Sequence, residues 1–251
     1  MNDSHWIYLS PHLDDAVYSC GGMLWEQVQR GVQAEVWTIF AGDPPSGPLT
    51  PFARSLHERW QSGDESAAAR RAEDMQACQI LGAGWRHFEY PDCIYRFDHA
   101  GRLVIEGETD LFRAGYEGEP ELVDHLVKRL ADELPANASL VIPFGYGNHV
   151  DHQLVRRAAK KLSETDWAGQ RWLYADYPYA ASTAENLSHW LNQPGEQLDL
   201  PVSAAGLESW QQAAAAYRSQ ISTFWKSTDE LRQKISAYRD SGAGSRLIRL
   251  I

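Results

Sequence analysis

Short apolar runs alternate with amphipathic stretches along the chain. The apolar runs end at polar, glycine or proline residues, which is typical of buried strands. They lie at residues 6–10, 34–40, 85–89, 139–143 and 171–176. Between them, apolar residues recur every three or four positions and predict helices at residues 22–30, 66–81, 120–130 and 151–162. This alternation predicts an α/β fold: a mainly parallel sheet with helices on both faces.

Two long segments interrupt this alternation. Residues 42–63 are rich in proline, glycine and serine, and residues 92–118 are irregular. Loops of this length in a compact domain are commonly functional, so we expect both to overhang the site and contact a substrate. The alternative is that both are solvated surface. The aromatic and charged residues expected to do so are Phe52, Arg54, Trp60, Tyr95, Arg96 and Arg102.

The last third of the chain contains a further helical pattern. Apolar residues recur every three or four positions from Leu207 to Phe224 and predict one long amphipathic helix packed on the sheet. No internal repeat, low-complexity tract or linker divides the sequence. We therefore expect residues 1–251 to form a single domain.

Composition and charge exclude several classes of protein. Hydrophobic residues make up 43% and charged residues 23%, which is ordinary for a globular chain and excludes disorder. The formal net charge of −11 repels phosphate backbones, so we expect no nucleic-acid partner. No run approaches the ~20 apolar residues that a spanning helix needs. The first residues lack the basic region of a secretory signal, which favours a cytoplasmic protein.

Histidines and aspartates follow two of the predicted strands. His12, Asp14 and Asp15 come directly after the first strand, and His149, Asp151 and His152 come after residues 139–143. In parallel α/β sheets, ligands bind at the carboxyl ends of the strands. We therefore expect these six side chains to meet at one edge of the sheet. A helix-capping role for Asp15 and Asp151 is the alternative.

The donor set favours a catalytic metal site. Neutral imidazole and carboxylate suit Zn²⁺ or Fe²⁺, and three protein ligands with an open position are typical of catalytic sites. His12 and Asp15 are three residues apart in a turn and can converge on one ion, with His152 as the third ligand. Asp14 is then free to act on a bound water, and His149 faces the same region.

Both motifs resemble the signatures of a known family. Pro11-His12-Leu13-Asp14-Asp15 and His149-Val150-Asp151-His152 resemble those of the LmbE-like, or PIG-L-like, metal-dependent deacetylases. Weaker matches follow in the family's order at residues 70–74, 174–180 and 216–221. Leu13 and Val150 stand where the family often has proline, and Ala16 stands where it often has glutamate, but none of these is an expected ligand.

The resemblance implies a Rossmann-like α/β fold and an enzyme. The expected activity is that of a Zn²⁺-dependent N-deacetylase, in which metal-activated water hydrolyses the acetamide of an N-acetylglucosamine-type substrate, a small-molecule sugar conjugate. His12, Asp15 and His152 correspond to the metal ligands, and Fe²⁺ suits the same ligands. Asp14 corresponds to the general base, and His149 to the residue that assists the oxyanion and the leaving amine.

Three further residues are expected around this centre. Asp151 is expected to hold His149 and to favour its protonated form, since a neighbouring carboxylate raises a histidine pKa. Arg70 corresponds to a substrate-binding arginine, although Arg71 is adjacent and stays an alternative. Tyr146 is a candidate donor to substrate in the loop after residues 139–143, or else an aromatic residue that packs on the surface.

Other classes of protein share parts of this pattern. Receiver domains also place paired aspartates after a first strand, but they bind Mg²⁺, for which imidazole is a poor ligand. Gly21-Gly22 does not extend to the Gly-x-Gly-x-x-Gly pattern of dinucleotide-binding proteins. The alternative that stays open is a metal-dependent amidohydrolase of the same fold acting on a non-sugar amide. The sequence has no signal for assembly, so a homo-oligomer also stays open.

Overall fold

One mixed sheet organises the structure. The computed structural model describes residues 5–60 and 66–250, and within these the sheet has seven strands in the order β3-β2-β1-β4-β5-β7-β6. The strands are β1 (His5–Ser10), β2 (Gln33–Thr38), β3 (Gly84–His87), β4 (Ser139–Pro143), β5 (Gln170–Tyr174), β6 (Gln197–Asp199) and β7 (Arg246–Arg249). Neighbouring pairs among β1 to β5 are parallel, whereas β7 is antiparallel to both β5 and β6. The predicted mainly parallel sheet is confirmed.

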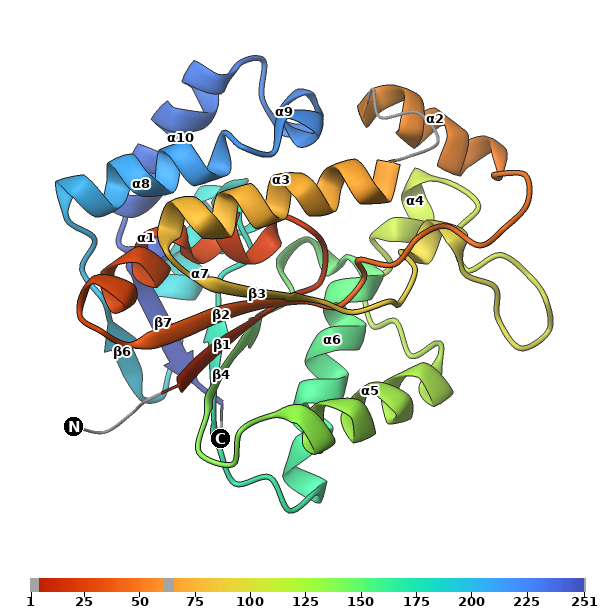
Figure 1. Cartoon of the computed structure of the whole chain (residues 1–251), viewed down its shortest axis with the longest axis horizontal. Coiled ribbons are helices and arrows are strands. Elements are labelled where there is room, and N and C mark those ends of the chain that lie inside the picture. Colours follow the sequence, from red (N-terminus) through yellow and green to blue (C-terminus); the bar gives the residue numbers. More distant parts are fainter. Residues whose placement is uncertain (1–4, 61–65, 251) are drawn as a thin grey trace.

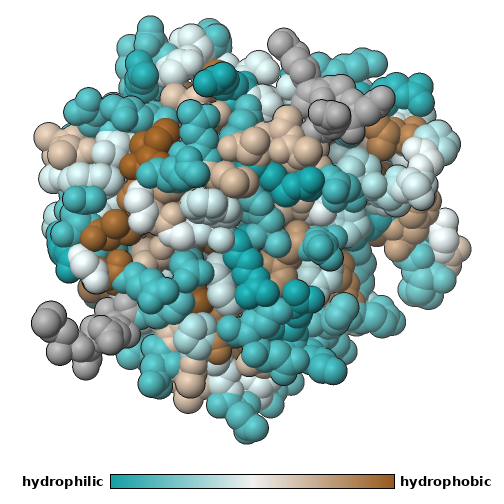
Figure 2. Space-filling model, viewed as in Figure 1, coloured by the Kyte–Doolittle hydropathy of each residue, from teal (hydrophilic) through white to brown (hydrophobic). Residues whose placement is uncertain are grey.

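Helices cover both faces of this sheet (Figure 1). One face carries α1 (Asp15–Gln29), α3 (Ser66–Leu81), α8 (Ala204–Ala214) and α10 (Thr228–Asp240), and the other carries α5 (Pro120–Glu133) and α6 (Val150–Lys161). The remaining α-helices of the described residues are α2 (Pro51–Trp60), α4 (Glu108–Leu111), α7 (Ala184–Leu191) and α9 (Arg218–Phe224). The face seen in Figure 2 is mostly hydrophilic, with scattered hydrophobic residues. None of the helices in the described part is long and apolar enough to span a membrane.

The two strands that precede the histidine–aspartate motifs are neighbours. β1 and β4 pair in parallel, with Trp6 opposite Ser139 and Tyr8 opposite Val141. All of β4 and the last four residues of β1 are buried. Strands covered on both faces are expected to read as continuous apolar runs, which is why both were visible in the sequence. Their carboxyl ends lie at the same edge of the sheet.

The structure corrects three expected elements. The first helix begins at Asp15 rather than at residue 22. Gly21 and Gly22 lie inside it, where the lack of a side chain allows Trp210 to approach. The 42–63 segment, whose end lies outside the described residues, contains a helix, α2. The long helix expected near the end is broken: α8 ends at Ala214 and α9 begins at Arg218. Tyr217 lies in the break, where its buried hydroxyl donates to Asp74 at 2.6 Å.

The contact between α1 and α8 gives a test of this packing. A Cβ at Gly21 would lie 2.3 Å from Cδ1 of Trp210. Trp210 is fully buried, and its indole N–H donates to the Val17 carbonyl at 2.7 Å, so it has little freedom to move. Overpacking costs about 1–3 kcal/mol, more than the ~1 kcal/mol of helix propensity that alanine adds.

We therefore expect Gly21→Ala to lower the free energy of unfolding by about 1–2 kcal/mol, measured by thermal and urea denaturation. Gly107→Ala is the matched control, because a Cβ there meets no atom within 4 Å and its backbone is extended. An unchanged or higher Tm for Gly21→Ala, relative to this control, would contradict the packing described.

Candidate active site

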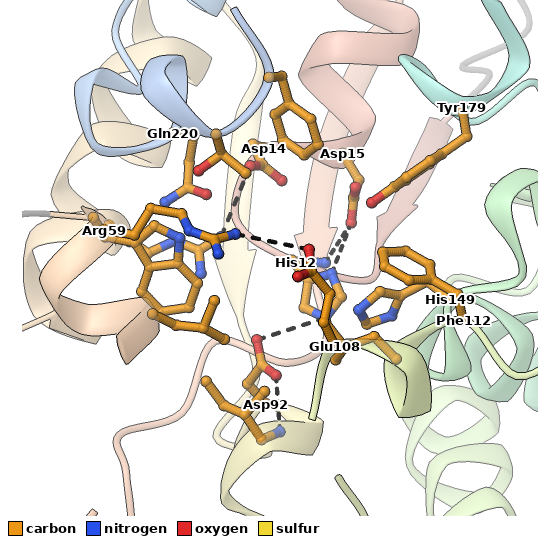
Figure 3. Close-up of a pocket in the computed structure, with 17 residues that line it drawn as sticks. His12, Asp14, Asp15, Arg59, Asp92, Glu108, Phe112, His149, Tyr179 and Gln220 are labelled. Atoms are coloured by element: carbon orange, nitrogen blue, oxygen red, sulfur yellow. Dashed lines mark hydrogen bonds and ion pairs between the residues drawn. The ribbon is translucent and has the colours of Figure 1, made fainter. Parts of the chain in front are cut away.

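A pocket of about 200 Å³ opens at the carboxyl ends of β1 and β4. His12, Asp14, Asp15 and His149 point into it (Figure 3). Its walls come from three segments outside the sheet. These are α2, the region from Asp92 to Phe112, and α9, to which Arg70 of α3 and Tyr179 are added. The pocket therefore combines residues from both predicted motifs with residues from distant parts of the chain.

A tight turn after β1 presents the first motif. Ser10 Oγ donates to the His12 carbonyl at 2.6 Å and accepts from the Ala16 amide at 3.0 Å. Asp15 Oδ2 accepts from the His12 amide at 2.8 Å. Asp14 has a φ of 153°, a conformation that costs a non-glycine residue about 1–3 kcal/mol. The buried hydrogen bonds of the turn hold Asp14 in this conformation and direct its carboxylate into the pocket.

Asp15 lies between His12 and His152. Asp15 Oδ2 lies 3.2 Å from His12 Nδ1 and 3.2 Å from His152 Nε2. Two ligands bound at 2.0–2.1 Å to one tetrahedral ion are about 3.3 Å apart, so these spacings fit a shared divalent cation. The donor set, two imidazoles and a carboxylate, suits Zn²⁺ or Fe²⁺.

His152 is oriented by a residue that the sequence did not single out. Its Nδ1 lies 2.7 Å from Asp176 Oδ1, at the end of β5. Asp176 Oδ2 accepts from the amides of Gly145 and Tyr146. A carboxylate on one ring nitrogen of a histidine fixes the proton there and leaves the other nitrogen free as a ligand. Burial lowers the pKa of His152, but Asp15 and Asp176 outweigh burial and raise it to about 9.

Asp14 and Asp15 have opposite environments although they are adjacent. Burial and the charge of Asp15 raise the pKa of Asp14 to about 8, against a smaller opposing effect of Arg70, whose Nη2 lies 3.8 Å away. Burial also opposes ionisation of Asp15, but His152 and His12 outweigh it and hold its pKa well below the usual range. Asp15 thus stays ionised, whereas Asp14 can take up a proton near neutral pH.

His149 caps the amino terminus of α6 and faces the pocket. Its Nδ1 accepts from the Asp151 amide at 3.3 Å, so Nε2 carries the ring proton of the neutral form. Burial, with His12 and His152 nearby, holds the pKa of His149 well below its ordinary value. Asp151 acts to raise the pKa of His149, as expected, but burial and the two histidines outweigh it, so His149 is a neutral hydrogen-bond donor.

The Asp151 carboxylate makes different contacts from those expected. It accepts from Arg96 Nη2 at 2.5 Å and from the Cys93 amide at 3.2 Å, and Oδ2 lies 3.0 Å from His12 Nε2. It is fully buried. Only the backbone amide of Asp151 contacts the His149 ring, because the carboxylate is directed toward His12. The hydrogen bond of the Asp151 carboxylate is therefore to His12 and not to His149.

The structure distinguishes Arg70 from Arg71. Arg70 lines the pocket, and its guanidinium carbon lies 4.7 Å from the centre of the Trp60 ring. Its buried Nε has no hydrogen-bond partner among the described residues. Arg71 instead donates to the Ala41 carbonyl and to Asp43, each at 2.8 Å. Arg70 is thus the arginine available to a ligand.

Tyr146 does not reach the pocket. Its hydroxyl lies 2.7 Å from His189 Nδ1, and its ring stacks on Phe144. The loop turns this way because Asp176 binds the backbone amides of Gly145 and Tyr146. Tyr146 therefore does not donate to a ligand in the pocket, and its ring is buried in the core rather than packed on the surface, as the alternative had it.

The two long segments do overhang the site, as expected, but mostly through other residues. Of the six aromatic and charged residues expected there, Trp60 lines the pocket. Helical spacing within α2 would have indicated Leu56 and Arg59 as its companions. The remaining wall residues that the sequence did not indicate are Asp92, Ile94, Glu108, Leu111, Phe112, Tyr179, Gln220, Thr223 and Phe224. Those from α9 carry no local signal, because only the fold brings them to β1.

The chain is similar to several known deacetylases. The chain is 28% identical over 188 residues to a 2′-N-acetylparomamine deacetylase of Niallia circulans, a match that covers 69% of this chain and 67% of the relative. It is 32% identical over 181 residues to a 2′-N-acetylparomamine deacetylase of Streptomyces fradiae, a match that covers 69% of this chain and 57% of the relative. A solved structure of the zinc-inhibited form of teicoplanin deacetylase is similar with a TM-score of 0.76 and 26% identity, covering 98% of this chain and 99% of the other.

The family model for GlcNAc-PI de-N-acetylase, PIG-L, matches residues 7–163. This range is more than half of the chain and includes both strand-end motifs. The resemblance read from those motifs is confirmed: the chain belongs to the PIG-L, or LmbE-like, deacetylase family.

Proposed function

We propose that this protein is a metal-dependent N-deacetylase that hydrolyses the acetamide of an N-acetylated sugar compound. The observation that carries the proposal is the convergence of His12, Asp15 and His152 beside the free carboxylate of Asp14. The names of the relatives, deacetylases of acetylparomamine and of teicoplanin, support an amide of a sugar-containing compound as the substrate.

In this proposal, Zn²⁺ or Fe²⁺ held by His12, Asp15 and His152 would supply the Lewis acidity that acidifies water and polarises the acetamide carbonyl. Asp14 takes a proton from the attacking water and delivers it to the departing amine. His149 donates its Nε2–H to the oxyanion of the tetrahedral intermediate. Collapse of that intermediate breaks the C–N bond and gives acetate and the free amine.

The pocket walls suit a polyhydroxylated ligand. Trp60, Phe112 and Phe224 supply aromatic rings to the pocket, and aromatic rings pack well against the apolar face of a sugar. Arg59, Asp92 and Glu108 supply charged groups for hydroxyls or a substrate amine. Since these residues lie on segments outside the sheet, we propose that they select the substrate, while the residues at the sheet edge catalyse the hydrolysis.

Activity and metal content should depend on each other. Purified protein should release acetate from N-acetylated amino sugars, lose at least a hundredfold in rate after chelation and regain it with Zn²⁺ or Fe²⁺. His12→Ala, Asp15→Ala and His152→Ala should each remove the bound metal, as measured by elemental analysis, because each deletes one of three ligands. His5→Ala, at the opposite end of β1, is the control and should retain it. Full activity in metal-free protein would contradict the proposal.

Asp14 should be needed for chemistry and not for metal binding. We expect Asp14→Asn to keep its metal and to lower kcat by about 10²–10⁴-fold, since the amide cannot accept the water's proton. Asp15→Asn is the matched variant, in which metal should be lost. If Asp14→Asn lost the metal and Asp15→Asn kept it, the two roles would be reversed.

Phe112 should contribute to substrate affinity. Its ring packs against His149 and Tyr179 with centroids 5.5 and 5.9 Å apart. We expect Phe112→Ala to raise KM for an acetylated amino sugar by about three- to tenfold, the value of an aromatic contact, with metal content unchanged. Phe97→Ala, an exposed phenylalanine of the same segment outside this pocket, is the control. Equal KM values for both variants, or no preference for sugars over simple acetamides, would favour a non-sugar amide as the substrate.

A further inference from the structure

A chain of buried ion pairs leads from His12 to the start of α5. His12 Nε2 lies 3.0 Å from Asp151 Oδ2. Asp151 Oδ1 accepts from Arg96 Nη2 at 2.5 Å. Arg96 then donates from Nε and Nη2 to the two carboxylate oxygens of Glu119, at 2.7 and 2.9 Å. The exposed fraction of the Asp151, Arg96 and Glu119 side chains is 0%, 6% and 9%.

We propose that Arg96 and Glu119 are positioning residues that, through Asp151, fix the ring of His12 for metal binding. The inference rests on the metal site of the proposed function. It assigns to Arg96 a role different from the substrate contact expected from the sequence. Neither Arg96 nor Glu119 lines the catalytic pocket.

The two ring nitrogens of His12 face different carboxylates. Nδ1 is directed at Asp15, 3.2 Å from Oδ2, which is the direction of the shared cation. Nε2 faces Asp151 Oδ2, and a carboxylate accepts a hydrogen bond only from a protonated nitrogen. Asp151 therefore holds the proton on Nε2 and leaves the Nδ1 lone pair free. This arrangement mirrors the contact of Asp176 with Nδ1 of His152.

Asp151 must be ionised to accept this hydrogen bond from His12. An isolated carboxylate with no solvent exposure would be strongly destabilised and would take up a proton. Here Arg96 Nη2 donates to Asp151 Oδ1 at 2.5 Å and the Cys93 amide donates to Oδ2 at 3.2 Å, so the buried charge is compensated. Arg96 thus keeps Asp151 an acceptor, and only an acceptor can orient His12 Nε2–H.

Several contacts fix the position of the Arg96 guanidinium. Its guanidinium makes a two-pronged contact with Glu119, donates to the Pro91 carbonyl at 3.0 Å and stacks over Phe40, with its carbon 4.6 Å from the ring centre. Glu119 has a φ of 55°, a left-handed conformation unusual for this residue, and Tyr116 donates to it at 3.0 Å. A lysine could supply the charge but could not form the fork.

Metal affinity distinguishes positioning from a purely structural salt bridge. Outer partners of metal-binding histidines typically contribute 10–100-fold to metal affinity. A bridge that only stabilised the fold would change the Tm and leave the affinity of the folded protein unchanged. The proposal therefore predicts a loss of affinity in variants that are still folded.

The test measures the Kd for Zn²⁺ of metal-free protein by competition with a chromophoric chelator. Arg96→Lys, Arg96→Met and Glu119→Gln should each weaken Zn²⁺ binding, by about 10–100-fold for Arg96→Met and less for the other two. The control is Arg246→Met, which removes an arginine from an ion pair with Asp199 between β6 and β7. It should leave the Kd unchanged. Circular dichroism and thermal unfolding of the metal-free variants verify the fold.

A double-mutant cycle identifies the route of the effect. If Arg96 acts through Asp151, then Arg96→Lys should cause no further loss in an Asp151→Asn background. Additive losses would contradict the proposed route. If Arg96→Met does not fold, Arg96→Lys and Glu119→Gln decide the question. Zn²⁺ binding within twofold of wild type in both would overturn this inference and leave the metal site intact, whereas a wild-type protein that bound no Zn²⁺ or Fe²⁺ would overturn the proposed function itself.

Discussion

Parallel pairing of β1 with β4 is the constraint on which the site depends. Residues separated by 139 positions, His12 and Asp151, come within hydrogen-bond distance because the two strands end at the same edge of the sheet. The pairing is fixed by two continuous apolar runs that are buried on both faces. Each strand then needs only a short turn or capped helix to present its histidines and aspartates. The apolar pattern of the two strands thus determines where the histidines and aspartates of the site come together.

The second constraint is the compensation of buried charge. Asp14, Asp15, Asp151 and Asp176 all lie buried at this edge, and their neighbours give them different properties. Asp151 is paired with Arg96, and Asp176 accepts two backbone amides as well as facing His152. Asp14 has Arg70 at 3.8 Å, but burial and the charge of Asp15 outweigh it and raise the pKa of Asp14 to about 8. Environments that separate the pKa values of adjacent carboxylates are a common way to assign a ligand and a base.

Much of this could be predicted from the sequence, and the exceptions have physical reasons. Strands β1 to β5 and the six motif residues were visible because they depend on local patterns. β6 and β7 were not predicted, because they have only three and four residues and therefore carry no recognisable apolar pattern. The partners of Tyr146 and Asp151, the hydrogen bond of Tyr217 and the role of Arg96 depend on contacts between distant segments. Such contacts leave no periodic signal, so Arg96 was assigned to a substrate loop although it pairs with Asp151.

The central claim is that one ion is held by His12, Asp15 and His152. X-ray absorption at the metal edge of the purified protein tests this most directly, because Cys93 also lies close to His149 and Asp151 and offers a competing ligand set. We expect nitrogen and oxygen neighbours at about 2.0–2.2 Å, with the multiple scattering of two imidazoles and no sulfur. A sulfur neighbour at about 2.3 Å, or a single imidazole, would contradict the assignment.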